Sequence, residues 1–234
     1  MIDSVNNEKI KYFKKLRDKK YILEEKKYIV ESEHLVEEAF KNNLVIEAFS
    51  LDERDNSTKV SINVMKKLSN LTNPPKILAV VRVLKEKPID GNILILDGIQ
   101  DPGNLGTIIR SAVSFGVDTI VASLDTVDAY NPKVIRGSEG MLFKINYLKR
   151  DLLSFINENK DNYTFITTDV SSGNDINDIK IDEHYALIMG NEGAGVRKEI
   201  SDEVDNKVHI KMNPVCESLN VSIATSILLY ELYK

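Results

Sequence analysis

The chain has 234 residues, with 31 Lys and Arg against 36 Asp and Glu and a formal net charge of −5 at pH 7. Hydrophobic residues make up 42% and charged residues 29%, a composition typical of globular proteins, which excludes a disordered tail or a collagen-like rod. The single cysteine, Cys216, excludes an internal disulfide and a thiol-based metal cage, and no apolar run reaches the ~20 residues that span a bilayer. With no signal-peptide core at the N-terminus either, we expect a cytoplasmic protein of one or two domains that needs neither a membrane nor a metal.

The charge is distributed unevenly along the chain. Residues 1–91 carry 18 basic against 15 acidic residues, whereas residues 92–234 carry 13 against 21. Within the first part, the stretch Lys9–Lys20 holds seven basic residues against one acid, Asp18. A basic stretch attached to an acidic remainder is typical of a polyanion-binding arm. For a lone basic stretch a solvated helix face is the better explanation, unless the rest of the chain also points to nucleic acid.

The first part of the chain reads as a small α/β domain over residues 1–84. Ser32 and Ser61 each precede a stretch with helical apolar spacing, as helix caps do. Helices are predicted over residues 9–20, 32–42 and from 61, and strands over 28–30, 44–51 and 77–83. Residues 85–91 combine Lys, Glu, Pro, Asp and Gly, and are the best candidate for a linker.

The second part, residues 92–234, alternates more regularly. Several of its apolar runs lack polar alternation, which favours a parallel sheet covered by helices on both faces. Strands are predicted at 93–96, 119–122, 163–167, 185–189 and 207–212, and helices at 104–115, 132–138, 148–157 and 218–230. In such doubly wound sheets ligands bind at the carboxyl ends of the strands, so the loops after Leu96, Met189 and Met212 are where we expect chemistry.

The loop after Leu96 leads into a helix with an unusual polar face. Asp101 before Pro102 is typical of a helix N-cap followed by proline in the first turn. Asn104 and Arg110 then project from a face whose other side chains are short, opposite an apolar face. Taken alone, this pattern is better explained as an amphipathic helix with one solvated arginine.

The other two loops are also weak signals when taken singly. Gly190–Gly195 is rich in glycine, which lets a backbone approach a ligand closely, but its spacing is not that of the dinucleotide-binding fingerprint. The segment from Ile210 to Ser222 leads through a polar entry into an apolar final helix, for which Ser218 or Glu217 is the predicted cap.

Taken together, in this order and spacing, the three loops resemble motifs 1, 2 and 3 of the SpoU (TrmH) family. Its members are S-adenosylmethionine-dependent RNA ribose 2′-O-methyltransferases of the SPOUT class. Asn104 with Arg110 matches motif 1, Gly190–Gly195 matches motif 2, and Glu217–Ser222 matches motif 3. The segment Asn131–Ser138 is similar as well, so the resemblance to the catalytic domain covers roughly residues 92–234.

Residues 1–84 resemble the small L30e-like RNA-binding domain that many members carry in front. Tyr28–Leu35 is similar to its typical strand-to-helix passage. With this resemblance the basic stretch is better explained as an RNA contact, and its candidate residues are Lys9, Lys11, Lys14, Lys15 and Arg17.

The resemblance also implies an architecture, a cofactor and a partner. The expected catalytic domain is a mostly parallel sheet with a deep trefoil knot, an exception to the rule against knots. The active site is expected at the interface of a homodimer. The second and third loops would hold S-adenosylmethionine, through Met189, Gly190, Asn191, Gly193, Gly195, Ile210, Met212, Ser218 and Leu219.

The implied catalytic residues are Arg110, Asn104, Glu192, Ser218 and Asn220. Because a guanidinium has a pKa above about 12, Arg110 is a poor general base at neutral pH. We expect it instead to bind the RNA phosphate and to stabilise the developing oxyanion. Asn104 would orient Arg110 or the ribose, and the remaining three would position the substrate and the loops.

Two departures and three alternatives qualify this interpretation. Lys211 and Pro214 stand where family members usually have Pro and Gly, which affects the shape of the donor loop more than the class of enzyme. One alternative is an RNA-binding protein on an inactive methyltransferase scaffold, and another is a nucleotide-binding enzyme that uses Gly190–Gly195 for phosphates. Transfer RNA is the alternative substrate, although the N-terminal domain favours ribosomal RNA.

Overall fold

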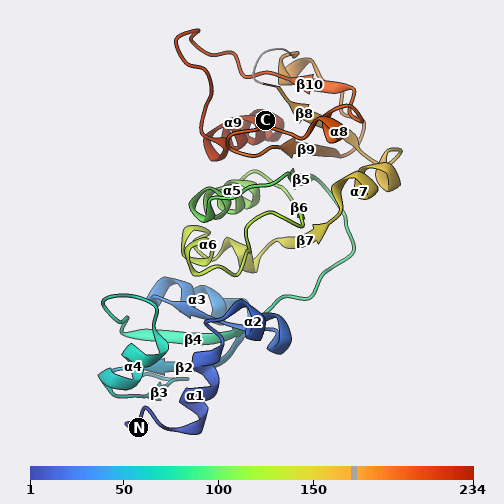
Figure 1. The fold of residues 1–234 in the computed structure, drawn as a ribbon. Helices are drawn as coiled ribbons and strands as arrows, with labels where there is room; N and C mark the ends of the chain where they lie inside the picture. Colours follow the sequence, from blue (N-terminus) through green and yellow to red (C-terminus); the bar gives the residue numbers. More distant parts are fainter. Residues whose placement is uncertain (170–172) are drawn as a thin grey trace. The chain divides into compact units, whose positions relative to one another are not determined.

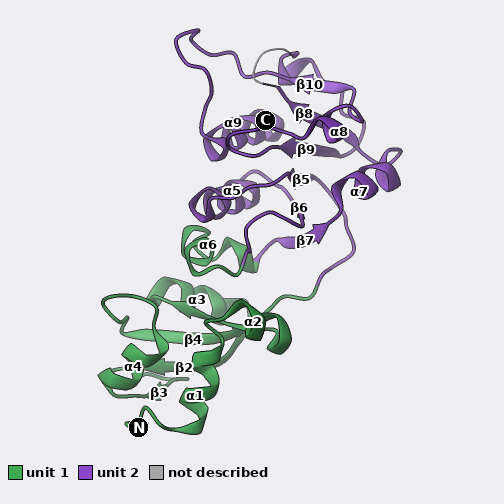
Figure 2. Cartoon of the chain, in the orientation of Figure 1, with its two compact units in different colours: residues 1–85, 130–143 green, residues 86–129, 144–234 purple. Residues whose placement is uncertain are grey.

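The computed structural model describes residues 1–169 and 173–234 (Figure 1). These residues form two compact units (Figure 2). Unit 1 comprises residues 1–85 and 130–143, and unit 2 comprises residues 86–129 and 144–234. The chain therefore passes between the units three times, and part of the segment between the first two motifs belongs to unit 1.

Unit 1 is built on a four-stranded mixed sheet with strand order β1-β4-β2-β3. β4 pairs antiparallel with β1 and β2, and β2 pairs parallel with β3. The strands are β1 (Lys27–Glu31), β2 (Val45–Ser50), β3 (Thr58–Lys59) and β4 (Ile77–Arg82). The helices of this unit are α1 (Glu8–Lys15), α2 (Lys19–Glu25), α3 (Glu33–Lys41), α4 (Ile62–Leu68), α6 (Pro132–Gly137) and the 3₁₀ helix η1 (Met141–Phe143).

Helices α1 and α4 share one apolar core with the sheet. Phe13 of α1 packs in the same cluster as Met65 and Leu68 of α4 and Phe49 of β2. Ser32 and Ser61 cap α3 and α4 as predicted, each accepting a hydrogen bond from a backbone N–H in the first turn.

The basic stretch forms two helices, so the prediction of one helix over residues 9–20 was wrong. α1 ends at Lys15, and Asp18 begins α2 by accepting a hydrogen bond from the Lys20 backbone N–H at 2.9 Å. An aspartate at this position favours a cap over a helix interior, since its side chain competes for backbone N–H groups.

Unit 2 contains a six-stranded, fully parallel sheet with order β10-β8-β9-β5-β6-β7. The strands are β5 (Ile93–Leu96), β6 (Thr119–Ser123), β7 (Asn146–Arg150), β8 (Thr164–Thr168), β9 (Tyr185–Met189) and β10 (Asn206–Val208). The helices are α5 (Pro102–Ser114), α7 (Leu152–Asn159), α8 (Lys198–Ser201), α9 (Val221–Tyr233) and the 3₁₀ helix η2 (Ile176–Asp178). The central strands β5 and β9 are wholly buried, which agrees with their unbroken apolar sequences.

Three expectations for unit 2 need correction. Residues 146–150 form an edge strand paired with β6, not the start of a helix, and Asp151 caps the helix only afterwards. The strand predicted to reach Met212 is shorter than expected. It covers only Asn206–Val208, where β10 pairs with β8. α9 is capped by Asn220, whose side chain accepts from the Ser222 N–H, and not by Ser218 or Glu217.

Among the described residues, no helix is long and apolar enough to cross a membrane.

Candidate functional site

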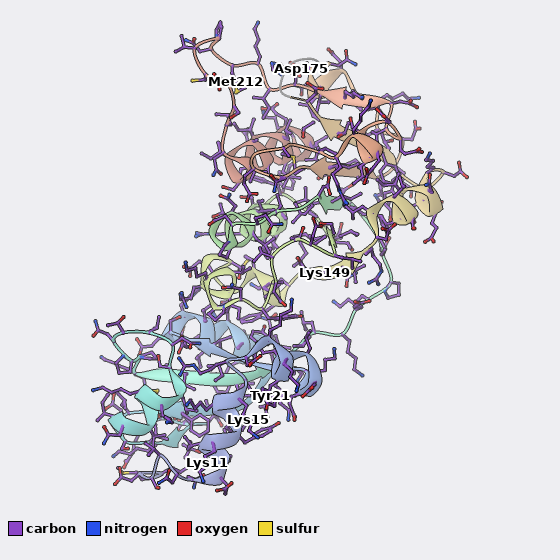
Figure 3. All side chains as sticks on the ribbon, in the orientation of Figure 1. Lys11, Lys15, Tyr21, Lys149, Asp175 and Met212 are labelled. Carbon is purple, nitrogen blue, oxygen red and sulfur yellow. The ribbon has the colours of Figure 1, made fainter. Side chains whose placement is uncertain are left out.

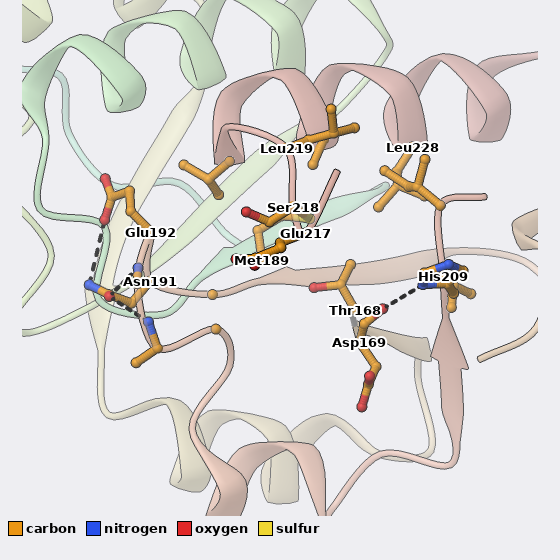
Figure 4. Close-up of a pocket in the computed structure, with 18 of the residues that line it drawn as sticks. Thr168, Asp169, Met189, Asn191, Glu192, His209, Glu217, Ser218, Leu219 and Leu228 are labelled. Atoms are coloured by element: carbon orange, nitrogen blue, oxygen red, sulfur yellow. Dashed lines mark hydrogen bonds between the residues drawn. The ribbon is translucent and has the colours of Figure 1, made fainter. Parts of the chain in front are cut away.

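A cavity of about 340 Å³ lies in unit 2 near the carboxyl ends of β8, β9 and β10 (Figure 4). Its volume falls within the range of about 300–1,000 Å³ that is usual for small-molecule sites. All nine residues predicted to hold the cofactor are part of its wall: Met189, Gly190, Asn191, Gly193, Gly195, Ile210, Met212, Ser218 and Leu219.

Further residues of the wall escaped sequence analysis. Thr168 ends β8 and Asp169 follows it, His209 follows β10, and Val221, Ala224 and Leu228 lie on one side of α9. The Nδ1 atom of His209 lies 3.2 Å from the carbonyl oxygen of Asp169 (Figure 4). Sequence analysis could not place these residues because it did not show that β8 lies between β9 and β10 in the sheet. This order brings the carboxyl ends of β8 and β10 to the second loop, which follows β9.

The glycine-rich second loop is held in shape by its own backbone and by Asn191. Asn191 and Gly195 exchange two backbone hydrogen bonds of 2.9 Å. The Asn191 side-chain oxygen accepts from the N–H groups of Gly193 and Ala194, while its amide donates to the Gly98 carbonyl at 2.7 Å. A Cβ atom at Gly190 would stand 2.1 Å from the Gly195 carbonyl carbon, so the close approach requires glycine there.

Glu192 joins the second loop to the first. Its carboxylate accepts hydrogen bonds from the backbone N–H groups of Gln100 (3.2 Å) and Asp101 (3.0 Å) and from the Asn104 side-chain amide (3.1 Å). Partial burial alone would raise the pKa of Glu192, but the hydrogen bonds from Asn104 and from these backbone groups outweigh it and lower the pKa. Glu192 is therefore ionised at neutral pH and fixes the entrance to α5.

Asn104 extends this connection to the third loop. Its side-chain oxygen accepts from the amide of Asn220 at 3.0 Å, and the Asn220 oxygen accepts from the Ser222 N–H at 2.9 Å. The candidate residues Glu192, Asn104 and Asn220 thus form one hydrogen-bonded chain through all three loops. Asp101 caps α5 as predicted, accepting from the Asn104 N–H at 2.9 Å.

Arg110 and Ser218 lie apart from this chain. Arg110 is exposed on α5, six residues beyond Asn104, and among the described residues its guanidinium has no hydrogen-bond or ion-pair partner. Such a guanidinium is available to an anionic ligand. Ser218 is exposed in the third loop and lines the cavity.

The unusual Pro214 has a local explanation. It occupies the second position of a turn closed by a 2.9 Å hydrogen bond from the Cys216 N–H to the Asn213 carbonyl. Proline suits this position because its fixed φ matches the turn and its missing N–H is not needed there.

An ion pair between a buried carboxylate and a half-exposed arginine escaped sequence analysis entirely. Asp97 directly follows β5, and its side chain is 1% exposed. Its carboxylate accepts from the Arg197 backbone N–H (2.8 Å) and from the Arg197 guanidinium (2.7 Å). This contact holds the end of the second loop, two residues beyond Gly195, against the beginning of the first.

The basic candidates of unit 1 differ in their contacts. Lys9 lies 2.5 Å from the carboxylate of Glu47, and Lys11 lies 2.8 Å from that of Glu8. The other three candidates, Lys14, Lys15 and Arg17, have no carboxylate within ion-pair distance among the described residues.

The chemistry of the cavity fits S-adenosylmethionine. Three carboxylates, from Asp169, Glu192 and Glu217, belong to its described wall, which contains no Lys or Arg, and this suits a ligand with a cationic sulfonium. Met189 and Leu219 offer apolar surface for a purine ring, and the glycine backbone of the second loop leaves room beside it.

Comparison with known families accounts for most of the chain. Residues 91–230 match the SpoU rRNA Methylase family, and residues 7–79 match the MRM3-like substrate binding domain. The 23S rRNA (guanosine(2553)-2′-O)-methyltransferase RlmP of Bacillus subtilis is 35% identical over 99% of this chain and 98% of its own length.

Solved structures agree with this assignment. A putative RNA methyltransferase of the TrmH family from Porphyromonas gingivalis superposes with a TM-score of 0.85 at 27% identity, covering 97% of this chain and 98% of that one. An AdoMet-bound rRNA methyltransferase from Sinorhizobium meliloti does so with a TM-score of 0.85 at 25% identity, covering 98% and 95%. The chain therefore belongs to the SpoU (TrmH) family of RNA 2′-O-methyltransferases and carries an MRM3-like substrate-binding domain at its N-terminus.

Proposed function

We propose that this protein transfers a methyl group from S-adenosylmethionine to a ribose 2′-hydroxyl of ribosomal RNA. The observation that carries the proposal is the hydrogen-bonded chain Glu192–Asn104–Asn220, which joins all three motif loops beside the 340 Å³ cavity. When bound, the cofactor supplies an electrophilic methyl group on a sulfonium.

The side chains of the site have different roles in this proposal. Arg110, whose guanidinium has no partner among the described residues, binds an RNA phosphate and stabilises negative charge that develops on the ribose oxygen. Asn104 orients the ribose, while Glu192 and Asn220 hold Asn104 in place through their hydrogen bonds. Ser218, in the cavity wall, positions the donor side of the site. The nine cofactor residues of the wall hold the donor itself.

The proposal includes three features of the whole protein. The catalytic domain, over residues 92–234, carries the deep trefoil knot of its family, with residues 85–91 as linker and residues 1–84 as an L30e-like RNA-binding domain. The protein is a homodimer in the cytoplasm, where ribosomal RNA is modified. The family membership supports each of these features.

The relative in Bacillus subtilis suggests which RNA to test first. That protein is named for guanosine 2553 of 23S rRNA, and its alignment spans both domains of this chain. The equivalent guanosine is our first candidate for the methylated nucleotide. Transfer RNA is the alternative, because several relatives are described as tRNA/rRNA methyltransferases.

The decisive experiment is profiling of 2′-O-methyl sites in ribosomal and transfer RNA from cells with and without the gene. We expect one site in 23S rRNA to be lost, restored by the wild-type gene and not by Arg110→Ala, because the proposal assigns Arg110 to stabilise the developing charge. Purified Arg110→Ala should still bind S-adenosylmethionine in calorimetry. Restoration of the site by Arg110→Ala would refute the role of Arg110. Loss of a site in transfer RNA would show that transfer RNA, and not ribosomal RNA, is the substrate.

A further inference from the structure

The basic residues of α1 are of two kinds. Lys9 and Lys11 are each paired with a carboxylate, of Glu47 and Glu8, at 2.5 and 2.8 Å. A carboxylate beside a lysine offsets its positive charge and repels a second anion, so a paired lysine attracts phosphate less strongly than an unpaired one. These two are therefore poorly placed to bind RNA phosphate.

Lys14 is in the opposite situation. It is exposed in the last turn of α1, and the charged group that affects it most is another cation, Lys67, in the last turn of α4. Helices α1 and α4 pack in one apolar core, and the Lys67 ammonium lowers the pKa of Lys14. Two helices from distant parts of the sequence thus present like charges to each other.

Arg17 completes the cluster and holds it together. Its Nε donates to the Asn70 side-chain oxygen at 2.5 Å, and its guanidinium donates to the backbone carbonyl of Lys67 at 3.4 Å. Arg17 therefore fixes the segment after α1 against the end of α4. Among the described residues, none of Lys14, Arg17 and Lys67 forms an ion pair.

Helix dipoles explain only part of this arrangement. A cation is favoured at the carboxyl end of a helix, so one lysine at the end of α1 and one at the end of α4 are each unremarkable. The dipoles do not account for two ammonium groups and a guanidinium brought together without an ion pair among the described residues. Such a cluster is unfavourable alone and is relieved by a bound anion.

An aromatic side chain lies next along the chain. The Nζ atoms of Lys15 and Lys20 lie 5.6 and 5.9 Å from the centre of the Tyr21 ring. Figure 3 labels Lys15 and Tyr21 in unit 1. Cations together with a partly exposed aromatic ring are typical of surfaces that bind single-stranded RNA, through phosphates and stacked bases.

We propose that Lys14, Arg17 and Lys67 bind the phosphodiester backbone of the substrate RNA, and that Tyr21 with Lys15 and Lys20 extends this surface. The proposal rests on the proposed function, since it names the part of unit 1 that meets the RNA. Lys67 lies outside the basic stretch and could not be associated with it from the sequence.

The test compares two double variants with the same loss of charge. Lys14→Gln with Lys67→Gln removes two cations of the cluster, and Lys9→Gln with Lys11→Gln removes two paired lysines. The probe is a fluorescently labelled 20-nucleotide polyuridine RNA, titrated with the full-length protein at several salt concentrations. We expect the cluster variant to bind about tenfold more weakly and to lose about 1.4 from the slope of log K against log salt, or ~0.7 per lost phosphate contact.

The paired-lysine variant should change the affinity by less than about twofold. Equal losses in the two variants would overturn the proposal, because they would report net charge and not a site. Unchanged binding by the cluster variant would also overturn it.

Thermal unfolding separates binding from folding: the cluster variant should be as stable as wild type or more so, since it removes a repulsion. In methyl transfer to total ribosomal RNA from gene-deleted cells, the cluster variant should raise KM for RNA and leave KM for S-adenosylmethionine unchanged.

This outcome is distinguishable from failure of the proposed function. If wild-type protein binds the oligonucleotide through the cluster but transfers no methyl group to any ribosomal RNA, the catalytic proposal fails and the binding site stands. If methyl transfer proceeds and the cluster variant keeps the wild-type KM for RNA, the binding site fails.

Discussion

Asp97 is a buried charge at the point where the first and second loops meet. Its carboxylate is satisfied by the backbone and the guanidinium of Arg197, and this hydrogen bonding raises the pKa of Arg197. Asp97 is almost completely buried, while the Arg197 side chain is about half exposed. The Asp97 charge therefore depends on Arg197 for most of its compensation.

Replacing Arg197 by alanine should lower the free energy of unfolding by about 2–3 kcal/mol, because it leaves a buried carboxylate with one backbone donor. The loss of the contact should also weaken binding of S-adenosylmethionine, since the end of the second loop is released. Urea denaturation and calorimetry measure the two effects. The matched control is Arg150→Ala, which breaks the exposed pair with Glu86 at 2.7 Å and should change stability by less than about 1 kcal/mol. Equal effects of the two substitutions would contradict the role assigned to Asp97.

At the scale of elements, the second loop is the part of the site whose shape is most constrained. Its ends are joined by the paired hydrogen bonds between Asn191 and Gly195. The Glu192 side chain accepts a hydrogen bond from the loop before α5. The two glycines at its beginning and middle are not equivalent. A Cβ at Gly190 would meet backbone atoms of Gly195 and Val196 at 2.1 Å, whereas a Cβ at Gly193 would meet only the Asn191 side chain, at 3.7 Å.

Gly190→Ala should therefore displace the backbone of the second loop, because backbone atoms cannot avoid the new methyl group by a side-chain rotation. We expect binding of S-adenosylmethionine to weaken by at least about tenfold. Gly193→Ala adds the same methyl group at an ordinary van der Waals distance from the Asn191 side chain, and should bind the donor much more nearly like wild type. Isothermal calorimetry on the two variants provides the comparison. Similar affinities for both would mean that the close approach at Gly190 is not what shapes the donor site.

At the scale of the whole molecule, α9 connects the site to an exposed apolar row. On one side α9 packs on α5, with a 2.7 Å hydrogen bond between Ser111 and Ser226. On another side Ile223, Ile227 and Tyr230 follow at helical spacing and are 51%, 37% and 48% exposed. The proposed homodimer offers a partner for this row, continuous with the third loop that precedes α9.

We expect light scattering to give the wild-type protein twice the 26.4 kDa mass of one chain, and Ile227→Asp to give the mass of one chain with reduced methyl transfer. A charge in the centre of an apolar interface is left without compensation when the interface closes. The control is Ile62→Asp on α4 of unit 1, which is similarly exposed and should leave the mass unchanged. A wild-type mass of one chain would rule out the homodimer.

The sequence by itself determined the class of the protein and much, though not all, of its local structure. Apolar runs without alternation indicated the buried parallel strands, and Ser32, Ser61 and Asp101 marked the beginnings of three helices correctly. These features depend on residues within one or two turns of each other, so they can be recognised in a linear chain. The three motif loops could be recognised for the same reason, because each is a short pattern at a strand end.

Only the tertiary structure decided which of these patterns meet. Asn104 is 88 residues from Glu192 and 116 from Asn220, yet it bonds to both, because β9 pairs beside β5 and α9 packs on α5. The Asp97–Arg197 contact and the cluster of Lys14 with Lys67 have the same origin, since they join segments 100 and about 50 residues apart. Strand order follows from burying apolar surface between distant segments, and no property of a short stretch encodes it.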